Sequence, residues 1–421
     1  MDCGKMSIIF GSNESVECNY GENMNTLVVA PPGGGKTFSI VSPNIINNNG
    51  CSMFIDDKKG NLYHTHSKRL KKEGYKVYCF NLINFKGNIH YNPFSLLRTR
   101  NDIHKIVNFL IPDEKTGKDP YWIDSARELA ECLIEILMHD NKPVTFESFI
   151  SLLHMTGTDE VDDLCDFGEW SNEYVFKVIA KQKNRGEDYA GMERYKSIRK
   201  NAKDTWRSIR SSCISAVAAF DSDELFTVTD KTTIDFTRMA DEKVAIFVTS
   251  SDINNTYAPL VKFMYRDILE KLIHYADNMC IDNNSMLPQH VRFILDDFAS
   301  GTIMEGFENI IANCRSRNIS FLICIQSLTQ LRGLYGSMVD SILDCINYKV
   351  YFSSSNLNTQ RYLSEIMNIP LLDIQKMGKE DLCLEKINCC PKFIKRLTCD
   401  EIVNLLNKNS VKAANKKDCY K

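Results

Sequence analysis

"TLVVAPPGGGKTFSIVSPNI" (residues 26–45) runs from a short apolar stretch through a glycine-rich turn to a lysine followed by a hydroxyl residue. That order is typical of a phosphate-binding loop that joins a buried strand to a helix. The full pattern has a glycine six positions before the lysine, where this chain has Ala30. That position starts the turn and need not approach a phosphate, so we expect the alanine to be tolerated.

The residues of this loop predict a nucleotide site. Successive backbone N–H groups can point at a phosphate where small residues reach positive φ, and Gly33, Gly34 and Gly35 allow this. We expect Lys36 to reach the β- and γ-phosphates and Thr37 to offer its hydroxyl to Mg²⁺ at the start of the next helix. The sequence thus predicts ATP and Mg²⁺ as ligands.

Apolar runs recur along the chain and predict buried strands. The runs are continuous rather than alternating, which is typical of strands covered on both faces, and helix-length segments separate most of them. These features predict an α/β fold with a mostly parallel sheet. The expected strands are residues 26–30, 51–57, 75–80, 243–251, 291–297, 320–327 and 348–354.

Strand signals stop between residues 95 and 235, where helical periodicity replaces them. In "DPYWIDSARELAECLIEIL" (119–137), Asp119 suits the N-cap and Pro120 the first helical position. Five apolar residues of this segment share one face, namely Trp122, Ala126, Leu129, Leu133 and Leu137. We therefore predict an all-α domain at 96–234, inserted into an α/β domain formed by 1–95 and 235–408. A basic tail follows at 409–421.

A pair of carboxylates at the end of a second buried strand would complete a hydrolytic site. "FILDD" (293–297) supplies Asp296, expected to hold the metal, and Asp297, expected to polarise the attacking water. The alternative interpretation is a turn with two solvated aspartates. Lys36 and Asp296 are 260 residues apart (296 minus 36), as an inserted domain predicts.

Polar residues flank the next predicted strand. Arg315 and Arg317 in "NCRSRNIS" (313–320) precede it, where one of them either reaches the γ-phosphate of a neighbouring subunit or is merely solvated. Gln326 follows the strand, where an amide either senses the γ-phosphate or caps the strand.

Residues 181–210 carry a local excess of positive charge, with ten Lys and Arg against four Asp and Glu. Within it, basic residues three or four apart predict one helical stripe, and Tyr195, Ile198, Ala202 and Ile209 predict a second, apolar one. Such a basic stripe contacts phosphates or an acidic partner, unless it is a solvated helix face. The basic residues are Lys196, Lys200, Lys203, Arg207 and Arg210.

Composition sets the broad class. The 421 residues are 43% hydrophobic and 25% charged with a net charge of -3, which is ordinary for a globular protein and gives no overall sign of nucleic-acid binding. The 16 cysteines are scattered through a long chain, which favours a reducing, intracellular compartment. No apolar run reaches the ~18 residues of a membrane-spanning helix.

In these motifs the chain resembles the VirD4/TraG family of type IV secretion coupling proteins, the motor ATPases of bacterial conjugation. The matching elements occur in order between residues 26 and 370. They are "APPGGGKT" (30–37), "IDDKKGNLY" (55–63), "HYNPFS" (90–95), "DPYWIDSARELAECLIEIL" (119–137), "TIDFTRMADEKVAIFVTSSD" (233–252), "FILDDFAS" (293–300) and "RSRNISFLICIQSLTQL" (315–331).

The resemblance implies a RecA-like sheet, a helical domain near a pore entrance, and a ring, commonly a hexamer, that handles DNA. It assigns Lys36 and Thr37 to ATP and Mg²⁺, Asp296 to the metal, Gln326 to γ-phosphate sensing, and Arg315 or Arg317 to a finger acting on the neighbouring subunit. The implied activity is ATP-driven translocation of relaxase-bound single-stranded DNA toward the proteins of a secretion channel.

The chain departs from the family pattern in three places. Asp297 replaces the usual glutamate, "DDKKG" (56–60) replaces "DPKG" and is followed by Asn61 in place of an acidic residue, and only 25 residues precede the loop region where the family has two transmembrane helices. We therefore expect either an incomplete chain or a cytoplasmic form that a partner recruits to the inner face of the membrane. The alternatives to a motor for single-stranded DNA are a nucleotide-binding adaptor without motor activity and a ring motor for double-stranded DNA or protein secretion.

Overall fold

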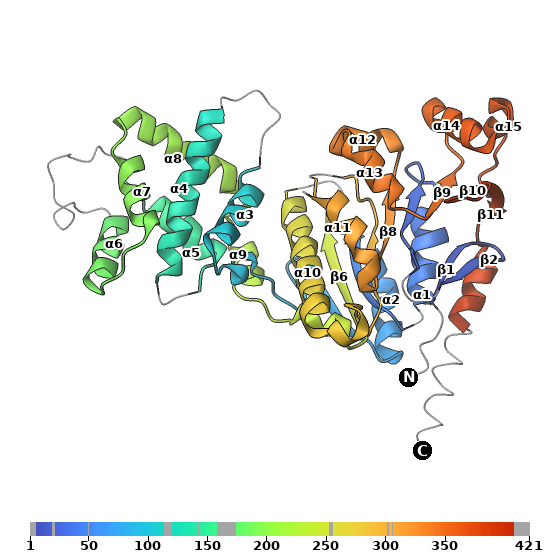
Figure 1. Ribbon diagram of the computed structural model, residues 1–421, viewed down its shortest axis with the longest axis horizontal. Helices are drawn as coiled ribbons and strands as arrows, with labels where there is room; N and C mark the ends of the chain where they lie inside the picture. Colours follow the sequence, from blue (N-terminus) through green and yellow to red (C-terminus); the bar gives the residue numbers. More distant parts are fainter. Residues whose placement is uncertain are drawn as a thin grey trace, which may run out of the picture. The chain divides into compact units, whose positions relative to one another are not determined.

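The computed structural model describes residues 6–18, 22–48, 50–112, 120–140, 143–157, 174–251, 256–300, 303–304 and 306–407. The chain divides into a sheet unit, residues 1–84 with 235–421, and a helical unit, Phe85–Ile234 (Figure 1). The helical unit thus begins before residue 96 and ends at residue 234. The predicted N-cap Asp119 and the basic tail 409–421 lie outside the described residues.

A nine-stranded sheet forms the centre of the described sheet unit. Its strand order is β11-β10-β9-β3-β8-β7-β4-β6-β5, and the seven strands from β9 to β5 are parallel. These parallel strands are β3 Thr26–Val29, β4 Ser52–Lys58, β5 Lys76–Asn81, β6 Val244–Ser250, β7 Val291–Leu295, β8 Ile319–Ile325 and β9 Tyr348–Phe352. Each overlaps one of the predicted segments, and β4, β5 and β8 extend one residue beyond theirs, so the predicted strands and the mostly parallel α/β fold are confirmed.

Four further strands, which the sequence did not predict, pair antiparallel. The hairpin of β1 Met6–Gly11 and β2 Glu14–Cys18 forms a separate small sheet. At one edge of the large sheet, β10 Asp381–Lys386 pairs with β9, and β11 Lys392–Lys395 pairs with β10. Their apolar runs are at most three residues long, and β2 and β11 are also partly exposed, so these strands gave a weaker signal than the parallel ones.

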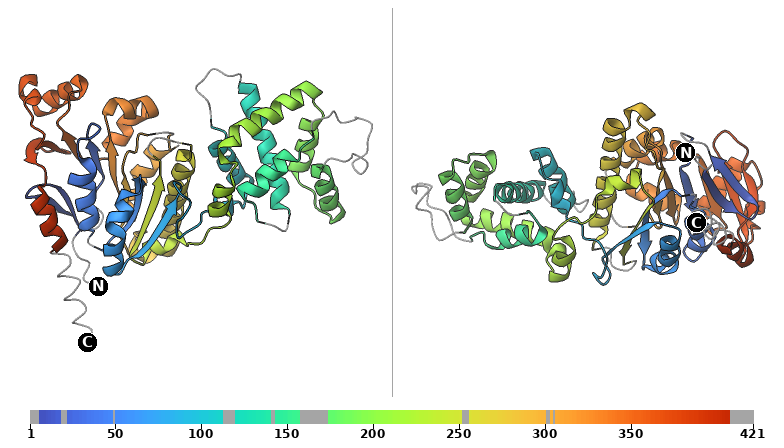
Figure 2. Two further views of the ribbon diagram at one scale, coloured as in Figure 1. Left: turned by 180° about the vertical axis from the view of Figure 1, so that it is seen from behind. Right: turned by 90° about the horizontal axis from the view of Figure 1, so that it is seen from below.

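Helices cover both faces of the large sheet (Figure 2). Tyr63 of α2 packs edge-on against Phe247 of β6, and Tyr265 of α10 packs against Phe54 of β4 on the opposite face. The helices of this unit are α1 Ser42–Ile46, α2 Asn61–Lys72, α10 Ala258–Met279, α11 Phe307–Cys314, α12 Leu328–Tyr335, α13 Met338–Asp344, α14 Leu357–Met367, α15 Leu371–Gln375 and a helix at 399–407. Short 3₁₀ turns occupy Phe236–Ala240, Ile281–Asn283 and Arg315–Arg317.

Helix α4 (Pro120–Met138) is the centre of the helical unit, with Ala126, Leu129 and Leu133 buried as predicted. Trp122 and Leu137 of the predicted face are only partly buried. The other helices are α3 Arg100–Leu110, α5 Phe146–His154, α6 Tyr174–Asn184, α7 Ala190–Arg199, α8 Lys203–Val217 and α9 Asp223–Thr229, with 3₁₀ turns at Pro93–Leu96 and Ala218–Phe220.

None of the helices in the described part of the chain combines the length and the apolar composition needed to cross a bilayer.

Candidate active site

The glycine-rich loop leaves the carboxyl end of β3 at the centre of the large sheet. Ala30 is fully buried and its N–H still bonds to the Ile325 carbonyl of β8 over 3.0 Å. Ala30 therefore continues the strand, which explains why no glycine is needed there. The loop turns only after it, where Gly34 N–H bonds to Pro31 O over 2.9 Å.

The backbone geometry of the loop requires glycine at each of its three glycine positions. Gly33 and Gly35 have φ of 72° and 87°, in the left-handed region that side chains disfavour. A Cβ on Gly34 would lie 2.9 Å from Pro31 O, too close for any side chain. A π-helical turn, Thr37–Val41, follows Lys36 and leads into α1. The loop thus ends, as expected, at the N-terminus of a helix.

Four of the predicted side chains meet at the carboxyl edge of β3, β8 and β7. Thr37 Oγ1 donates a hydrogen bond to Asp296 Oδ2 over 2.7 Å. Lys36 Nζ lies 3.6 Å from Asp296 Oδ1 and 3.7 Å from Asp297 Oδ1. The lysine is therefore paired with both carboxylates, and it would have to turn from them toward an arriving phosphate.

Gln326 is the fifth member of this cluster. It follows β8 directly and donates from Nε2 to Asp297 Oδ1 over 3.2 Å. Asp297 itself has φ of 72°, so the chain turns sharply at this carboxylate. A short polar side chain tolerates such a conformation better than a β-branched one. The bond thus holds Asp297, which follows β7, from the end of the neighbouring strand β8.

The donor set fits a hydrated Mg²⁺. Oδ1 of Asp296 is buried and has no hydrogen-bond partner within the described residues, and the nearest cation is Lys36 at 3.6 Å. A buried carboxylate oxygen without a partner is costly unless a cation binds it. Together with the Thr37 hydroxyl it offers the oxygen ligands that Mg²⁺ takes beside phosphate oxygens.

A buried lysine that the sequence analysis missed supports the turn after Asp297. Lys262 of α10 donates from Nζ to Phe298 O over 2.6 Å and lies over the Phe298 ring at 4.3 Å. Burial lowers the pKa of Lys262 to about 7, an effect that the Asp56 carboxylate opposes. The only signal in the sequence is a lysine inside the apolar run "APLVKFM" (258–264).

The element "DDKKG" has a structural role beyond its turn. Asp57 accepts hydrogen bonds from Leu62 N at 3.1 Å and Tyr63 N at 2.7 Å, which caps the N-terminus of α2. Burial raises the pKa of Asp57 to about 6 despite these bonds. Asp56 next to it is fully buried and its pKa is also raised by burial.

The two predicted arginine-finger candidates lie at the other end of β8. Both precede the strand, whereas the loop and the carboxylates lie at its carboxyl end. Arg317 forms a bidentate pair with Asp277 of α10, at 2.9 and 3.0 Å. Arg315 is exposed, and among the described residues its guanidinium has no partner. Neither arginine belongs to the cluster at the carboxyl edge in this chain.

The prediction of one basic helical stripe is wrong. Helix α7 ends at Arg199, Lys200 caps it, and α8 begins only at Lys203, so the five basic residues belong to two helices. Ala202 is exposed at the break, whereas Tyr195, Ile198 and Ile209 are buried as predicted. Without glycine or proline in "RKNAKD" (199–204), the break had no clear signal.

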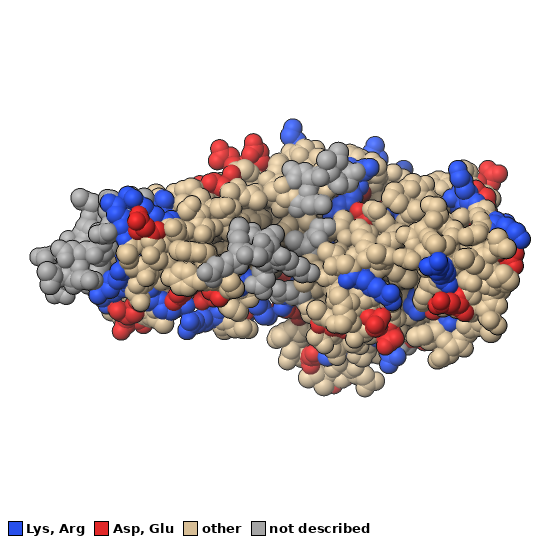
Figure 3. Space-filling view, turned by 90° about the horizontal axis from the view of Figure 1, so that it is seen from above, with Lys and Arg blue, Asp and Glu red and all other residues tan. Residues whose placement is uncertain are grey.

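The basic residues also differ in accessibility. Lys200 and Arg207 are exposed. Lys196 lies 3.6 Å from Glu193, and Arg210 donates to Thr156 Oγ1 at 2.7 Å. On the face of the helical unit in Figure 3, basic side chains gather at one end with acidic ones among them.

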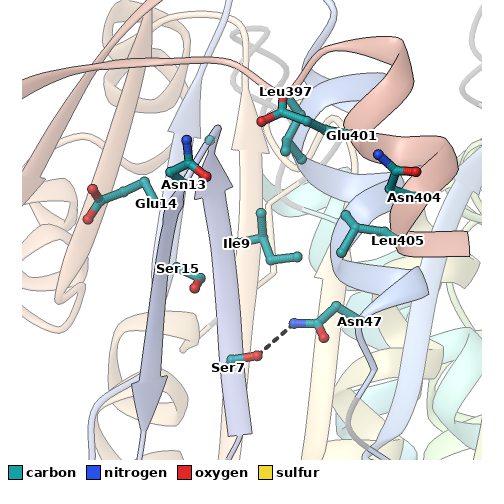
Figure 4. A pocket seen from close by; sticks show the side chains of 11 residues that line it. Ser7, Ile9, Asn13, Glu14, Ser15, Asn47, Leu397, Glu401, Asn404 and Leu405 are labelled. Atoms are coloured by element: carbon teal, nitrogen blue, oxygen red, sulfur yellow. Dashed lines mark hydrogen bonds between the residues drawn. The ribbon is translucent and has the colours of Figure 1, made fainter. Parts of the chain in front are cut away.

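A separate pocket of about 460 Å³ lies in the sheet unit between the β1–β2 hairpin and the helix 399–407 (Figure 4). Its described lining contains carboxylates and amides but no lysine, arginine or histidine, so it does not favour a phosphate. Glu401 in its wall is already bonded to Thr398 N at 2.8 Å. The lining residues are Ser7, Ile9, Gly11, Asn13, Glu14, Ser15, Asn47, Leu397, Glu401, Asn404 and Leu405.

Comparison with known sequences identifies one family and its relatives. Residues 3–367 match the family model described as type IV secretory system conjugative DNA transfer. The VirD4 proteins of Rhizobium radiobacter and of Agrobacterium fabrum strain C58 are each 24% identical over 360 residues, which are 82% of this chain and 48% and 49% of those proteins. The chain thus spans about half the length of these curated relatives.

Comparison of structures shows the same fold. The bacterial conjugative coupling protein TrwBdeltaN70 with sulphate has a TM-score of 0.62 at 13% identity, with 89% of this chain and 86% of that chain covered. TrwB with ADP and Mg²⁺ has a TM-score of 0.61 at 13% identity, over 89% and 85%. VirB4 of Thermoanaerobacter pseudethanolicus has a TM-score of 0.52 at 14% identity, over 95% and 98%.

Proposed function

This chain belongs to the type IV secretory system conjugative DNA transfer family, and we propose that it is the ATP-dependent coupling protein of such a system. In this proposal it recruits relaxase-bound single-stranded DNA and drives its translocation by ATP hydrolysis as a ring, commonly a hexamer. The observation that carries the proposal is the cluster of Lys36, Thr37, Asp296, Asp297 and Gln326 at one sheet edge.

The cluster supports a division of labour among its residues. Backbone N–H groups of Gly33–Gly35 and the Lys36 ammonium would bind the phosphates, and Thr37 with Asp296 would hold Mg²⁺. Bound Mg²⁺ would neutralise charge on the phosphate oxygens. TrwB, which shares the fold, has been solved with an ATP analogue and with ADP and Mg²⁺.

Asp297 and Gln326 are the proposed hydrolytic residues. The hydrogen bond from Gln326 Nε2 keeps one oxygen of Asp297 occupied, and the other is left to orient and polarise a water. Gln326 follows β8 and Asp297 follows β7, so loss of the γ-phosphate would change contacts at the ends of both strands. This arrangement suits an amide that senses whether the γ-phosphate is present.

Arg315 is the better candidate for the finger that acts on a neighbouring subunit. Its guanidinium is exposed, whereas the guanidinium of Arg317 is held by both oxygens of Asp277. An exposed arginine far from its own phosphate loop is what a ring with composite sites requires. Arg317 then serves to fix the 3₁₀ turn that carries Arg315.

The proposed DNA contact lies on the helical unit. Lys200 and Arg207 are exposed on either side of the α7–α8 break, and backbone phosphates are the ligands that such cations bind without sequence preference. Lys196, Lys203 and Arg210 are less accessible and have a secondary part in this proposal. The channel proteins and a membrane partner of the complex are further proposed partners.

One observation favours a second function. The carboxylate of Asp297 is one methylene shorter than the family's usual glutamate and lies 3.7 Å from Lys36, so it is held close to the loop. A nucleotide-binding recruitment adaptor without motor activity needs only to bind the nucleotide and does not need a carboxylate that reaches an attacking water. The structure offers no such argument for a motor acting on double-stranded DNA or on proteins, the remaining alternative.

The test is ATP turnover with and without single-stranded DNA, measured beside the oligomeric state by light scattering. The proposal predicts turnover that rises with single-stranded DNA more than with duplex DNA, in an assembly larger than a dimer. A chain that stays monomeric with ATP and DNA contradicts the ring and the role of Arg315. Nucleotide binding without turnover, unchanged by Asp297→Glu, supports the adaptor instead.

A further inference from the structure

An arginine from the opposite end of the chain lies at the phosphate loop. Strand β10 is antiparallel to β9, and β11 is antiparallel to β10, so β11 runs in the same direction as β3. Arg396 directly follows β11 and Glu380 directly precedes β10. Both residues therefore lie at the carboxyl edge of the sheet, where the loop and the carboxylates lie. Ligands of open α/β sheets bind along this edge.

Glu380 holds the guanidinium in one orientation. Arg396 Nε donates to Glu380 Oε2 and Nη2 donates to Oε1, each over 2.6 Å, and Arg396 N–H bonds to Glu380 O over 3.0 Å. Such a bidentate pair fixes the plane of the guanidinium as well as its position. The side chain of Arg396 is only 22% exposed, whereas that of Glu380 is 62% exposed.

The remaining corner of the guanidinium faces the loop. Arg396 Nη1 lies 3.3 Å from Gly34 O, the longest of its hydrogen bonds, and 3.2 Å from where a Cβ on Gly35 would be. A guanidinium nitrogen has two hydrogens, and a single long bond to a carbonyl leaves donor capacity for an anion. A side chain on Gly35 would meet this nitrogen, so the glycine also leaves room for the arginine.

The position of Arg396 indicates which part of a nucleotide it would meet. The γ-phosphate side of the site is marked by Asp297 and Gln326, which follow β7 and β8 on one side of β3. Arg396 comes from the β9–β10–β11 side, across the loop from these residues. A nucleotide with its γ-phosphate at the carboxylates presents its nucleoside end, and the phosphate next to it, toward this second side.

We propose that Arg396 is a nucleotide-binding residue that donates from Nη1 to the phosphate next to the nucleoside, with Glu380 as its positioning residue. The inference rests on the nucleotide binding proposed above. The contact gives the nucleotide a cationic partner from the edge hairpin β10–β11. Binding of a nucleotide at the loop would therefore also restrain that hairpin. An arginine suits the role because its planar fork serves Glu380 and a phosphate at once.

The test compares the affinity for ADP and ATP with Mg²⁺, by calorimetry, in wild type, Arg396→Ala and Arg396→Gln. Lys395→Ala is the matched control, since Lys395 is the cation next to Arg396, at the end of β11, and pairs with Asp381 instead. Both Arg396 variants should weaken Kd about tenfold to a hundredfold, the range for a hydrogen bond to a charged group. Lys395→Ala should stay within about twofold of wild type, as expected for an exposed ion pair.

A second measurement separates a ligand contact from support of the loop. Hydrogen exchange of the amides of 381–396 should slow when ADP binds to wild type and should not change in Arg396→Gln. The inference is overturned if both Arg396 variants bind ADP as tightly as wild type. It is also overturned if the variants bind more weakly but ADP does not slow hydrogen exchange of the hairpin amides in wild type. If wild type binds neither ADP nor ATP, the proposed function itself fails.

Discussion

Thr37 Oγ1 donates a hydrogen bond to Asp296 Oδ2 over 2.7 Å, although 259 residues separate the two along the chain. The bond joins the start of the helix after the loop to the end of β7. The two groups are the hydroxyl and the carboxylate that a nucleotide-bound Mg²⁺ requires, and they are brought together by the protein alone. The site is thus preorganised on the metal side.

Replacing Asp296 should remove the response to Mg²⁺. In Asp296→Asn the amide oxygen can still accept from Thr37, but it brings no negative charge to the metal. We expect the gain in ADP affinity from adding Mg²⁺ to shrink about tenfold or more, the scale expected when a metal site is disturbed. Calorimetry with Mg²⁺ and with EDTA measures this, and affinity in EDTA is the control. A variant with the wild-type Mg²⁺ response would remove Asp296 from the metal site.

Loss of the Gln326 amide should slow hydrolysis more than it weakens binding. Gln326→Ala frees Asp297 Oδ1 from its 3.2 Å bond and so loosens the carboxylate that orients the water. We expect kcat to fall about 10- to 100-fold with little change in KM, the pattern of an interaction needed in the transition state. Steady-state kinetics of this variant, beside the exposed amide variant Gln375→Ala, give the answer. An unchanged kcat would leave Gln326 as a simple strand cap.

Charge reversal at the α7–α8 break tests the DNA contact. Lys200→Glu and Arg207→Glu should each weaken binding of single-stranded DNA and reduce the slope of log affinity against log salt by about one. Fluorescence anisotropy across a salt series measures both quantities. Lys72→Glu, an exposed lysine of the sheet unit, is the charge-matched control. Equal losses in all three variants would indicate a general charge effect rather than a contact on the helical unit.

His290 makes the stability of the fold sensitive to acid. It is fully buried, with Nδ1 2.7 Å from Asn318 Oδ1 and Nε2 2.7 Å from Ser320 Oγ, and burial lowers the pKa of His290 to about 3. Its pKa in the unfolded chain is the ordinary 6.5. The unfolded state therefore binds more protons between these values, so this contribution to stability is complete above pH 6.5 and is lost as the pH falls toward 3.

The size of this effect follows from the shift in pKa. The contribution of His290 to the free energy of unfolding should fall by up to about 4–5 kcal/mol over that range, since one pKa unit is worth ~1.4 kcal/mol. Urea denaturation of wild type and His290→Gln at several pH values from 7 to 4 isolates it. The variant should be less stable at pH 7 but lose less on acidification. Parallel pH profiles would show that His290 titrates normally.

The parts of the fold that the sequence predicted are those encoded in contiguous residues. The parallel strands are buried on both faces, so each was visible as a continuous apolar run. The loop was visible because phosphate binding fixes the order of its residues. An alanine is tolerated at position 30 because that residue still continues the strand. The strand-end position of Asp296, Asp297 and Gln326 then brought them to the same edge, since parallel strands end together.

The missed features depend on contacts between distant segments. Arg396 reaches Gly34 across 362 residues, and Lys262 supports Asp297 only through the carbonyl of Phe298. No local pattern identifies such residues. The break between α7 and α8 was missed for another reason, since the basic and apolar spacing continues through "RKNAKD" with no residue that excludes a helix. The antiparallel strands were missed because their apolar runs are short, at most three residues.

We propose that this single cluster both binds and hydrolyses ATP. Its most direct test is phosphate release from saturating ATP, with single-stranded DNA present, in wild type, Lys36→Ala and Asp297→Asn, with ADP affinity measured on the same samples. We predict turnover in wild type, loss of both binding and turnover in Lys36→Ala, and about 100-fold or slower turnover with retained binding in Asp297→Asn. Wild-type turnover in Asp297→Asn, or no turnover in wild type, would contradict the claim.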